Sequence, residues 1–395
     1  MSVEPKLIPE VNIGTLGHVD HGKSTLVEAL SKKWTAQHTE ELKRGITIKL
    51  GYADATIYKC KNGELTTESK CLTHNCDTVA ERTVSFVDAP GHETLMATVL
   101  SGASLMDGVL FVIAANEKCP QPQTAEHLSV LNIIGMKNIV IVQSKIDLVT
   151  EEQAKKNYQE IKNFTKGTVA ENAPIIPVSA QQKINIDALL VAIEENIQTP
   201  QRKMDESPKM LIVRSFDINK PGTKPSKIVG GILGGSLIKG KLKVGDEIEI
   251  RPGTQIKGKW QPVKSKVVGL QKAMKDLEEA GPGGLLGVMT ELDPAITKAD
   301  TIAGNVAGYP GKLPPVLSKL NLELHLFDKT EQFRPEEMLV IAVGTARTVG
   351  TLLGVKKGVA EVELRIPVAA DKGERAAIAR KVGDRWKLVG WALLK

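Results

Sequence analysis

The sequence predicts an α/β domain with a doubly wound, mostly parallel sheet, followed by antiparallel β domains. Three observations support this fold class. Apolar strand candidates alternate with helical segments as far as Ile197, the order that forms a parallel sheet with helices on both faces. After Thr199-Pro200, short strand candidates dominate. Gly and Pro residues separate these later strands at short intervals, which is typical of small antiparallel barrels.

Apolar patterns predict the elements of the first part. Val109–Ala115 and Ile139–Gln143 are continuous apolar runs, typical of strands buried on both faces. Val11–Gly14 runs into a Gly-rich turn, and Thr83–Asp88 alternates before a turn, so both are predicted strands. The remaining strand and the helices are predicted at Ile175–Val178, Ser24–Lys33, Gln123–Leu131, Glu151–Phe164 and Ile186–Ile197.

Strands predominate in the second part, which begins after a polar linker candidate at Asp205–Pro208. A further break falls at Tyr309-Pro310-Gly311. Before that break, strands are predicted at Met210–Phe216, Ile228–Leu233, Glu247–Ile250, Val263–Leu270 and Leu285–Met289. After it, they are predicted at Leu320–Leu326, Met338–Val343, Gly350–Val355, Glu361–Leu364 and Trp386–Trp391.

Composition narrows the class of protein. The chain has 395 residues, of which 42% are apolar and 25% charged, ordinary values for a folded protein. The net charge of +6 is compatible with an RNA partner and equally with a merely basic protein. We expect no membrane association, because no apolar run approaches the ~20 residues that span a bilayer. Four cysteines without a secretory signal favour a reducing, cytoplasmic location.

A full match to the P-loop pattern G-x-x-x-x-G-K-[ST] is found at Gly17-His18-Val19-Asp20-His21-Gly22-Lys23-Ser24. A strand precedes it and a helix follows, as the motif requires. Backbone N–H groups there form a concave site for phosphate oxygens. Lys23 is expected to reach the β- and γ-phosphates and Ser24 to bind Mg²⁺. The predicted phosphate-binding residues are Asp20, His21, Gly22, Lys23, Ser24 and Thr25.

Two further segments have the residues of γ-phosphate switches. Asp88-Ala89-Pro90-Gly91-His92 ends a strand candidate. There Asp88 suits contact with Mg²⁺ through water, Gly91 can present its N–H to a γ-phosphate, and His92 is the candidate catalytic residue that orients the attacking water. In Arg44-Gly45-Ile46-Thr47, Thr47 is expected to bind Mg²⁺, with Gly45 and Asp20 nearby.

Guanine specificity is predicted from two segments that follow buried strands. In Ser144-Lys145-Ile146-Asp147, the Asp147 carboxylate can accept hydrogen bonds from guanine N1 and N2, which adenine does not supply, and Lys145 can lie along the base. The other segment is Ser179-Ala180-Gln181, which offers a backbone N–H to the guanine carbonyl.

In this order the motifs resemble those of the translational GTPases, which include elongation factor Tu. In closer detail the chain resembles the gamma subunit of archaeal translation initiation factor two. This closer resemblance rests on Glu41–Tyr52 (ELKRGITIKLGY), Leu95–Asp107 (LMATVLSGASLMD), Gln121–Thr124 (QPQT), Arg214–Gly222 (RSFDINKPG) and the pairs Arg385-Trp386 and Gly390-Trp391.

The resemblance implies a GTPase domain and two β-barrel domains, which we expect at 1–205, 206–312 and 313–395, with a Cys-containing insertion near 58–80. It implies GTP or GDP with Mg²⁺ as ligands, hydrolysis of GTP, and a heterotrimer with alpha and beta subunits. It also implies delivery of initiator methionyl-tRNA to the small ribosomal subunit. Because the family binds the methionylated end between the first two domains, Gly234 and Gly235 are candidate tRNA-binding residues.

The chain departs from the family pattern at two places. Ser144 stands where the guanine motif usually has Asn, and a hydroxyl replaces only part of an amide's hydrogen bonding. In the insertion, where relatives often have two C-x-x-C pairs, Gly63 replaces the fourth Cys. A zinc set of Cys60, Cys71, His74 and Cys76 and a metal-free remnant of such a site both remain open.

Three other functions compete with this one. An elongation-type carrier of aminoacyl-tRNA lacks the insertion between Tyr58 and Arg82. A metabolic GTPase that drives an enzyme, such as one for sulfate activation, would be expected to have a catalytic partner domain. A nucleotide-switched scaffold would not need His92.

Overall fold

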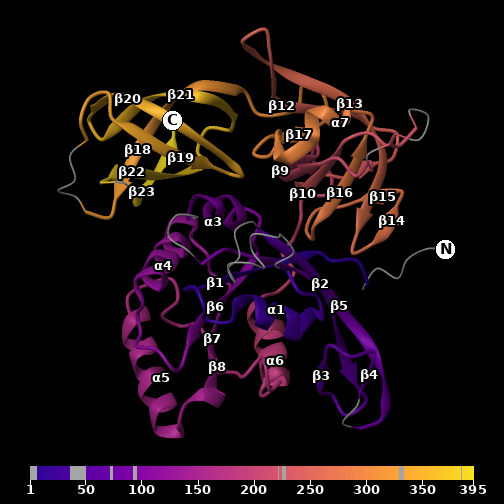
Figure 1. Cartoon of the computed structure of the whole chain (residues 1–395), viewed down its shortest axis with the longest axis vertical. Helices are drawn as coiled ribbons and strands as arrows, with labels where there is room; N and C mark the ends of the chain where they lie inside the picture. The colour runs from indigo at the N-terminus through magenta and orange to yellow at the C-terminus, as the bar shows by residue number, and fades with distance from the viewer. Residues whose placement is uncertain are drawn as a thin grey trace. The chain divides into compact units, whose positions relative to one another are not determined.

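The structure is a computed structural model that describes residues 7–35, 50–71, 74–91, 96–220, 222–224, 228–328, 333–383 and 385–395 (Figure 1). It divides into two compact units, Met1–Gln201 and Arg202–Lys395. Across the described ranges, no helix is long and apolar enough to cross a membrane.

The first unit is built on an eight-stranded sheet ordered β3-β2-β5-β1-β6-β7-β8, with β4 paired to β5. β5, β1, β6, β7 and β8 are parallel neighbours, whereas β2 runs antiparallel to β5. This mixed, mostly parallel sheet confirms the predicted fold class. The strands are β1 (Val11–Leu16), β2 (Gly51–Cys60), β3 (Leu65–Thr66), β4 (Lys70–Cys71), β5 (Cys76–Asp88), β6 (Gly108–Ala114), β7 (Ile139–Ser144) and β8 (Ile175–Pro177).

Helices follow the parallel strands. They are α1 (Lys23–Ser31), α3 (Met96–Ala103), α4 (Pro122–Ile134), α5 (Glu151–Thr165) and α6 (Ile186–Asn196), with a 3₁₀ turn η3 (Ile146–Leu148). Leu26 and Leu30 of α1 and Ile193 of α6 join Val11 and Phe86 of the sheet in one buried cluster. Burial of such side chains contributes roughly 1.5–3 kcal/mol each and holds α1 on the central strands.

The second unit contains two barrels. In the first, the order β12-β17-β9-β10-β16-β13 is closed by pairing of β12 with β13. Its strands are β9 (Lys209–Phe216), β10 (Ile232–Lys239), β12 (Glu247–Ile256), β13 (Lys259–Lys272), β16 (Leu286–Thr290) and β17 (Val306–Gly308). Accessory elements are β11 (Leu242–Lys243), β14 (Lys275–Leu277), β15 (Glu279–Ala280), α7 (Pro294–Thr297) and the 3₁₀ turn η5 (Lys298–Asp300).

The second barrel closes in the order β18-β21-β20-β19-β22-β23. Its strands are β18 (Val316–Leu326), β19 (Met338–Val343), β20 (Ala346–Lys356), β21 (Val359–Ala369), β22 (Arg375–Val382) and β23 (Arg385–Leu394). Inward residues such as Leu322, Ile341 and Val362 are fully buried in one cluster. The two closed antiparallel barrels confirm the remainder of the predicted fold class.

One strand lies elsewhere than predicted. The strand expected at Ile228–Leu233 instead runs from Ile232 to Lys239 as β10. A Cβ on Gly230 would lie 1.9 Å from the Thr290 carbonyl oxygen, so this glycine permits a close approach of two chain segments just before the strand. The Gly234-Gly235 pair lies inside β10.

Candidate functional site

The P-loop connects the central strand β1 to α1, and two glycines shape it. Gly17 has φ 148°, and a Cβ there would lie 2.2 Å from the Val112 carbonyl oxygen of β6. Gly22 has φ 84° and caps the N-terminus of α1, in the left-handed region that glycine adopts without strain. Because the first N–H groups of a helix have no acceptor within it, the loop delivers a helix N-terminus suited to an anion.

Lys23 lies beneath the P-loop. Its buried ammonium donates to the carbonyl oxygens of Gly17, at 2.9 Å, and His18, at 2.6 Å. Burial lowers the pKa of Lys23 to about 8, although the charges of Asp88 and Asp20 oppose the shift. A Cβ on Gly91 would lie 2.6 Å from the Lys23 Nζ. Gly91 thus brings the chain after β5 into direct contact with the P-loop lysine.

Asp88, at the end of β5, is fully buried and collects three hydroxyl groups. Thr15 of β1 donates at 2.7 Å, and Ser24 of α1 and Thr35 donate at 2.6 Å. The carboxylate and the Ser24 hydroxyl together form a set of hard oxygen groups, the chemistry that Mg²⁺ prefers. These residues therefore fit the magnesium site predicted for the P-loop.

The predicted guanine segments lie side by side at the ends of two neighbouring strands. The Ile146 N–H donates to the Val178 carbonyl at 3.5 Å, which joins the loop after β7 to the loop after β8. Ser144 is buried, and its Oγ donates to the His21 carbonyl of the P-loop at 2.7 Å. The guanine segment is thereby fixed directly to the phosphate segment.

The other candidates of this region take ordinary loop positions. Lys145 has φ 58° and precedes η3, which contains the exposed Asp147. Ser179 is buried and forms a bridge with Ile184. Partly buried Ala180, exposed Gln181, exposed Asp20 and partly buried Thr25 complete the set. The predicted residues Gly45, Thr47 and His92 lie outside the described residues.

Two side chains of α4 that the motifs did not predict contact the P-loop. The Gly17 N–H donates to Nδ1 of fully buried His127 at 2.7 Å. The Val19 N–H donates to Gln123 Oε1 at 3.3 Å. The sequence signal was the segment Gln121–Thr124, which carried a resemblance but gave no chemistry for His127.

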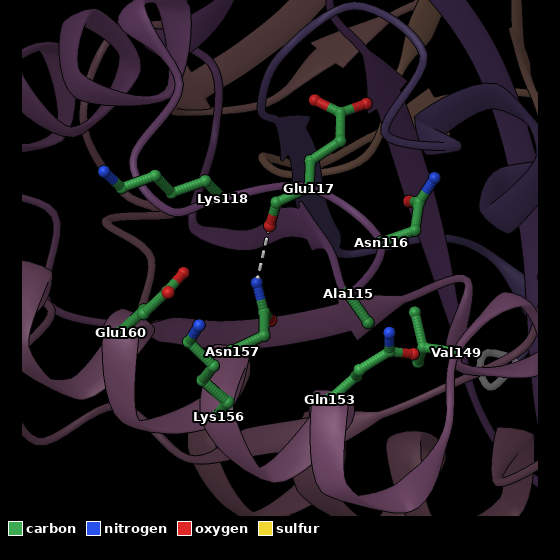
Figure 2. Close-up of a pocket in the computed structure, with 9 residues that line it drawn as sticks. All are labelled: Ala115, Asn116, Glu117, Lys118, Val149, Gln153, Lys156, Asn157 and Glu160. Atoms are coloured by element: carbon green, nitrogen blue, oxygen red, sulfur yellow. Dashed lines mark hydrogen bonds between the residues drawn. The ribbon is translucent and has the colours of Figure 1, made fainter.

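A pocket of about 390 Å³ lies between the loop after β6 and α5 (Figure 2). Its lining residues are Ala115, Asn116, Glu117, Lys118, Val149, Gln153, Lys156, Asn157 and Glu160. The amide of Asn157 donates to the Glu117 carbonyl at 2.9 Å, so this side chain holds the loop in place.

The Glu117 carboxylate lies 3.4 Å from His21 Nε2 of the P-loop. Burial lowers the pKa of His21 to about 4, which favours the neutral imidazole beside that carboxylate.

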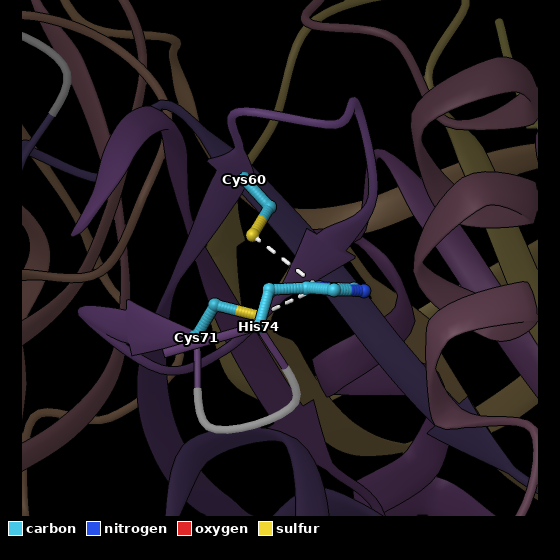
Figure 3. Close-up of side chains that lie close together, drawn as sticks. All are labelled: Cys60, Cys71 and His74. Atoms are coloured by element: carbon cyan, nitrogen blue, oxygen red, sulfur yellow. Dashed lines mark hydrogen bonds between the residues drawn. The ribbon is translucent and has the colours of Figure 1, made fainter. Parts of the chain in front are cut away.

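The four candidate zinc ligands lie near the end of the β2–β5 strand pair where β2 ends and β5 begins, and three of them form one cluster. Ligand atoms of Cys60, Cys71 and His74 lie within 4.8 Å of one another (Figure 3). The Cys76 Sγ is 3.0 Å from the Cys60 Sγ, and His74 Nδ1 is 3.3 Å from the Cys71 Sγ. Cys60, Cys71 and His74, with Cys76 in contact with Cys60, offer three thiols and one imidazole, a donor set that fits Zn²⁺.

The two candidate tRNA-binding glycines differ in their surroundings. A Cβ on Gly235 would lie 1.9 Å from the Leu211 carbonyl oxygen, within the barrel wall, whereas a Cβ on Gly234 would lie 3.4 Å from its nearest neighbour. The register of β10 against β9 shifts between these two glycines. Gly235 thus has a packing role that Gly234 lacks.

Family models match most of the chain. Residues 9–199 match the Elongation factor Tu GTP binding domain, residues 230–306 match Elongation factor Tu domain 2, and residues 318–394 match Initiation factor eIF2 gamma, C terminal.

Curated relatives match over nearly their full length. Translation initiation factor 2 subunit gamma from Archaeoglobus fulgidus is 56% identical over 98% of this chain and 95% of its own. The protein of that name from Pyrococcus abyssi is 56% identical over 98% and 97%. The one from Methanothermobacter thermautotrophicus is 54% identical over 98% and 99%.

Solved structures share the fold at lower identity. A bacterial selenocysteine-specific elongation factor EF-Sec superposes with a TM-score of 0.77 at 24% identity over 98% of this chain and 58% of that one. Elongation factor SelB from Methanococcus maripaludis, in complex with the GTP analogue GppNHp, gives 0.74 at 23% identity over 98% and 79%. The near-complete matches to initiation factors, and the family model at the C-terminal barrel, show that this chain is a translational GTPase and belongs to the translation initiation factor 2 subunit gamma family.

Proposed function

We propose that the chain binds initiator methionyl-tRNA in its GTP state and delivers it to the small ribosomal subunit in the cytoplasm. It would act as the gamma subunit of a heterotrimer with alpha and beta subunits. The observation that most supports this is the 56% identity to initiation factor gamma subunits over 98% of the chain. The family matches also support the proposed domains 1–205, 206–312 and 313–395, because each match lies within one of them.

We assign the phosphate chemistry to the P-loop and its neighbours. The Lys23 ammonium, held at the Gly17 and His18 carbonyls, would turn to the β- and γ-phosphates. The Ser24 hydroxyl donates a hydrogen bond to Asp88, which leaves the lone pairs of the Ser24 oxygen for Mg²⁺. Bound Mg²⁺ would neutralise charge between the two phosphates. We propose Thr47 as a second ligand, with Asp88, Asp20 and Gly45 nearby or acting through water.

Hydrolysis and base recognition fall to the remaining candidates. We propose that Gly91 presents its N–H to the γ-phosphate and that His92 orients the attacking water. Asp147 would accept the guanine N1 and N2 protons, with Lys145 along the base. The segment Ser179–Gln181 would meet the guanine carbonyl, and its position beside η3 supports this role.

The decisive experiment compares two tRNAs. Labelled methionyl initiator and methionyl elongator tRNA are titrated with this chain and its alpha subunit, in GDP or a GTP analogue. Preference for the initiator with the GTP analogue is the expected result. Equal binding of both tRNAs would indicate the alternative, an elongation-type carrier, and binding of neither would overturn both.

We also propose that Cys60, Cys71, His74 and Cys76 hold a structural Zn²⁺, which would join β2 to β5 where β2 ends and β5 begins. The clustering of Cys60, Cys71 and His74, with the Cys76 sulfur beside that of Cys60, supports this. Purified protein should contain about one zinc per chain by mass spectrometry, and Cys60→Ser should lose most of it. Cys119→Ser is the matched control, because Cys119 lies in a separate buried loop beside Glu160. Zinc-free wild-type protein would contradict the proposal.

A further inference from the structure

Two backbone N–H groups of the P-loop are satisfied by side chains from one face of α4. Gly17 donates to His127 Nδ1 at 2.7 Å, and Val19 donates to Gln123 Oε1 at 3.3 Å. The two acceptors are four residues apart and therefore lie on the same helix face. Since buried N–H groups need acceptors, these contacts fix which peptide groups of the loop turn towards α4 and which stay open to a ligand.

The contact to Gly17 requires one protonation state of His127. A ring nitrogen that accepts a hydrogen bond carries no proton, so the proton of the neutral ring lies on Nε2. The charged and titratable groups facing the ring are Lys23 of α1 and His18 and His21 of the P-loop. Burial, reinforced by Lys23, lowers the pKa of His127 to about 3. The imidazole therefore stays neutral and remains an acceptor at physiological pH.

Gly17 is constrained from three sides. His127 holds its N–H, Lys23 donates to its carbonyl at 2.9 Å, and Val112 of β6 leaves no space for a side chain at its Cα. A shift of Gly17 would move the carbonyl acceptor that Lys23 uses before it reaches a phosphate. The two peptide groups that meet at the Gly17 Cα thus link α4 to the P-loop lysine.

We propose that His127 is a positioning residue for nucleotide binding. It acts as a neutral acceptor for the Gly17 N–H, and together with Gln123 it allows the first turns of α4 to hold the phosphate-binding loop in place. This inference rests on the proposed nucleotide site. It adds to that site a residue that touches no part of the nucleotide.

The test compares an acceptor-deleting variant with an acceptor-retaining one. Dissociation of fluorescent GDP and of a GTP analogue is measured for wild type, His127→Leu and His127→Asn in the full chain. Loss of an acceptor from a buried N–H should speed GDP dissociation about 5- to 100-fold in His127→Leu. The Asn carbonyl can occupy the place of Nδ1, so His127→Asn should recover most of this loss. Ser129→Ala is the control on the same helix, because its hydroxyl donates to the Ala125 carbonyl within α4.

Each outcome decides between positioning and packing. Unchanged dissociation in His127→Leu would overturn the inference, as would a His127→Asn variant as weak as His127→Leu. If His127→Leu does not fold, Gln123→Leu replaces it, with an expected acceleration of about 2- to 10-fold and no change as the overturning result. A wild-type chain that binds no GDP, or whose binding survives Lys23→Ala, would instead overturn the proposed site itself.

Discussion

At the scale of single residues, Asp88 connects the parts of the site. It accepts hydroxyls from β1, from α1 and from Thr35 beyond α1, so one carboxylate sets the spacing of three segments. An ionised carboxylate accepts several such bonds at once, whereas an amide at this position would turn an N–H₂ group towards a hydroxyl proton. The proposed magnesium site and the local fold therefore depend on the same side chain.

The low pKa of Lys23 predicts that GDP affinity depends on pH. In the free protein this pKa is about 8 because the ammonium is buried, and neighbouring phosphates should raise it in the complex. Below that pH both states hold the proton, so the affinity is constant. Above it only the complex does, so affinity should fall by up to about tenfold per pH unit. Calorimetry in two buffers of different ionisation enthalpy should detect proton uptake above pH 8, and its absence would contradict this prediction.

Ser144 predicts a measurable deficit in nucleotide affinity. Its hydroxyl keeps one bond to the His21 carbonyl but lacks the additional groups of an amide. Ser144→Asn should therefore tighten GDP binding by roughly 1 kcal/mol, as measured by calorimetry. Ser144→Ala, which leaves that carbonyl without its donor, is the opposing variant and should weaken binding. No gain in Ser144→Asn would refute the prediction.

The sequence predicted the site residues unequally. Gly17 to Ser24 could be predicted because a phosphate loop is contiguous and its spacing is diagnostic. His127 was missed because its contact crosses 110 residues of sequence, and a buried histidine in a helix has no pattern of its own. Contacts that the fold creates between distant segments require the coordinates.

At the scale of elements, the adjacent glycines of β10 predict opposite effects of the same substitution. Gly235→Ala would bring a methyl group against the Leu211 carbonyl oxygen, whereas Gly234→Ala meets only ordinary contacts. Gly235→Ala should lower the free energy of unfolding by about 1–3 kcal/mol, and Gly234→Ala by less than about 1 kcal/mol. Urea denaturation of the full chain provides the measurement. Equal stability of the two variants would mean that the strand shifts freely at its bulge.

Strands were predictable where burial makes them continuously apolar. Gly108–Ala114 and Ile139–Ser144 are buried throughout, and their bounds were predicted to within a residue or two. Gly51–Cys60 and Arg375–Val382 escaped prediction because small and charged residues break their apolar pattern, although both have full antiparallel neighbours. Such strands are specified by their partners, since β-propensity depends strongly on context.

At the scale of the molecule, Lys209 joins the two barrels of the second unit and is expected to stabilise that unit. This β9 residue is largely buried and reaches two carboxylates that precede β22, Asp371 at 3.1 Å and Glu374 at 2.6 Å. Burial opposes its charge, but Glu374 and Asp371 together raise its pKa.

Lys209→Met should therefore lower the free energy of unfolding by about 1–3 kcal/mol, less than for a fully buried pair because the carboxylates remain partly exposed. Lys319→Met, which breaks the exposed pair with Glu363, should change it by less than about 0.5 kcal/mol. Urea denaturation monitored by tryptophan fluorescence would compare them. Identical unfolding curves for the two variants would show that the ion pairs of Lys209 do not stabilise the second unit.

Closure of the barrel formed by β18 to β23 affects how the sequence of such a protein can change during evolution. Every strand of that barrel has a hydrogen-bonded neighbour on each side, so no strand edge is open to pairing with another chain. A substitution on the outer wall changes a side chain but leaves the backbone ladder complete. A lineage can therefore accumulate new surface chemistry on this barrel, one residue at a time, while its buried cluster and its resistance to strand exchange stay the same.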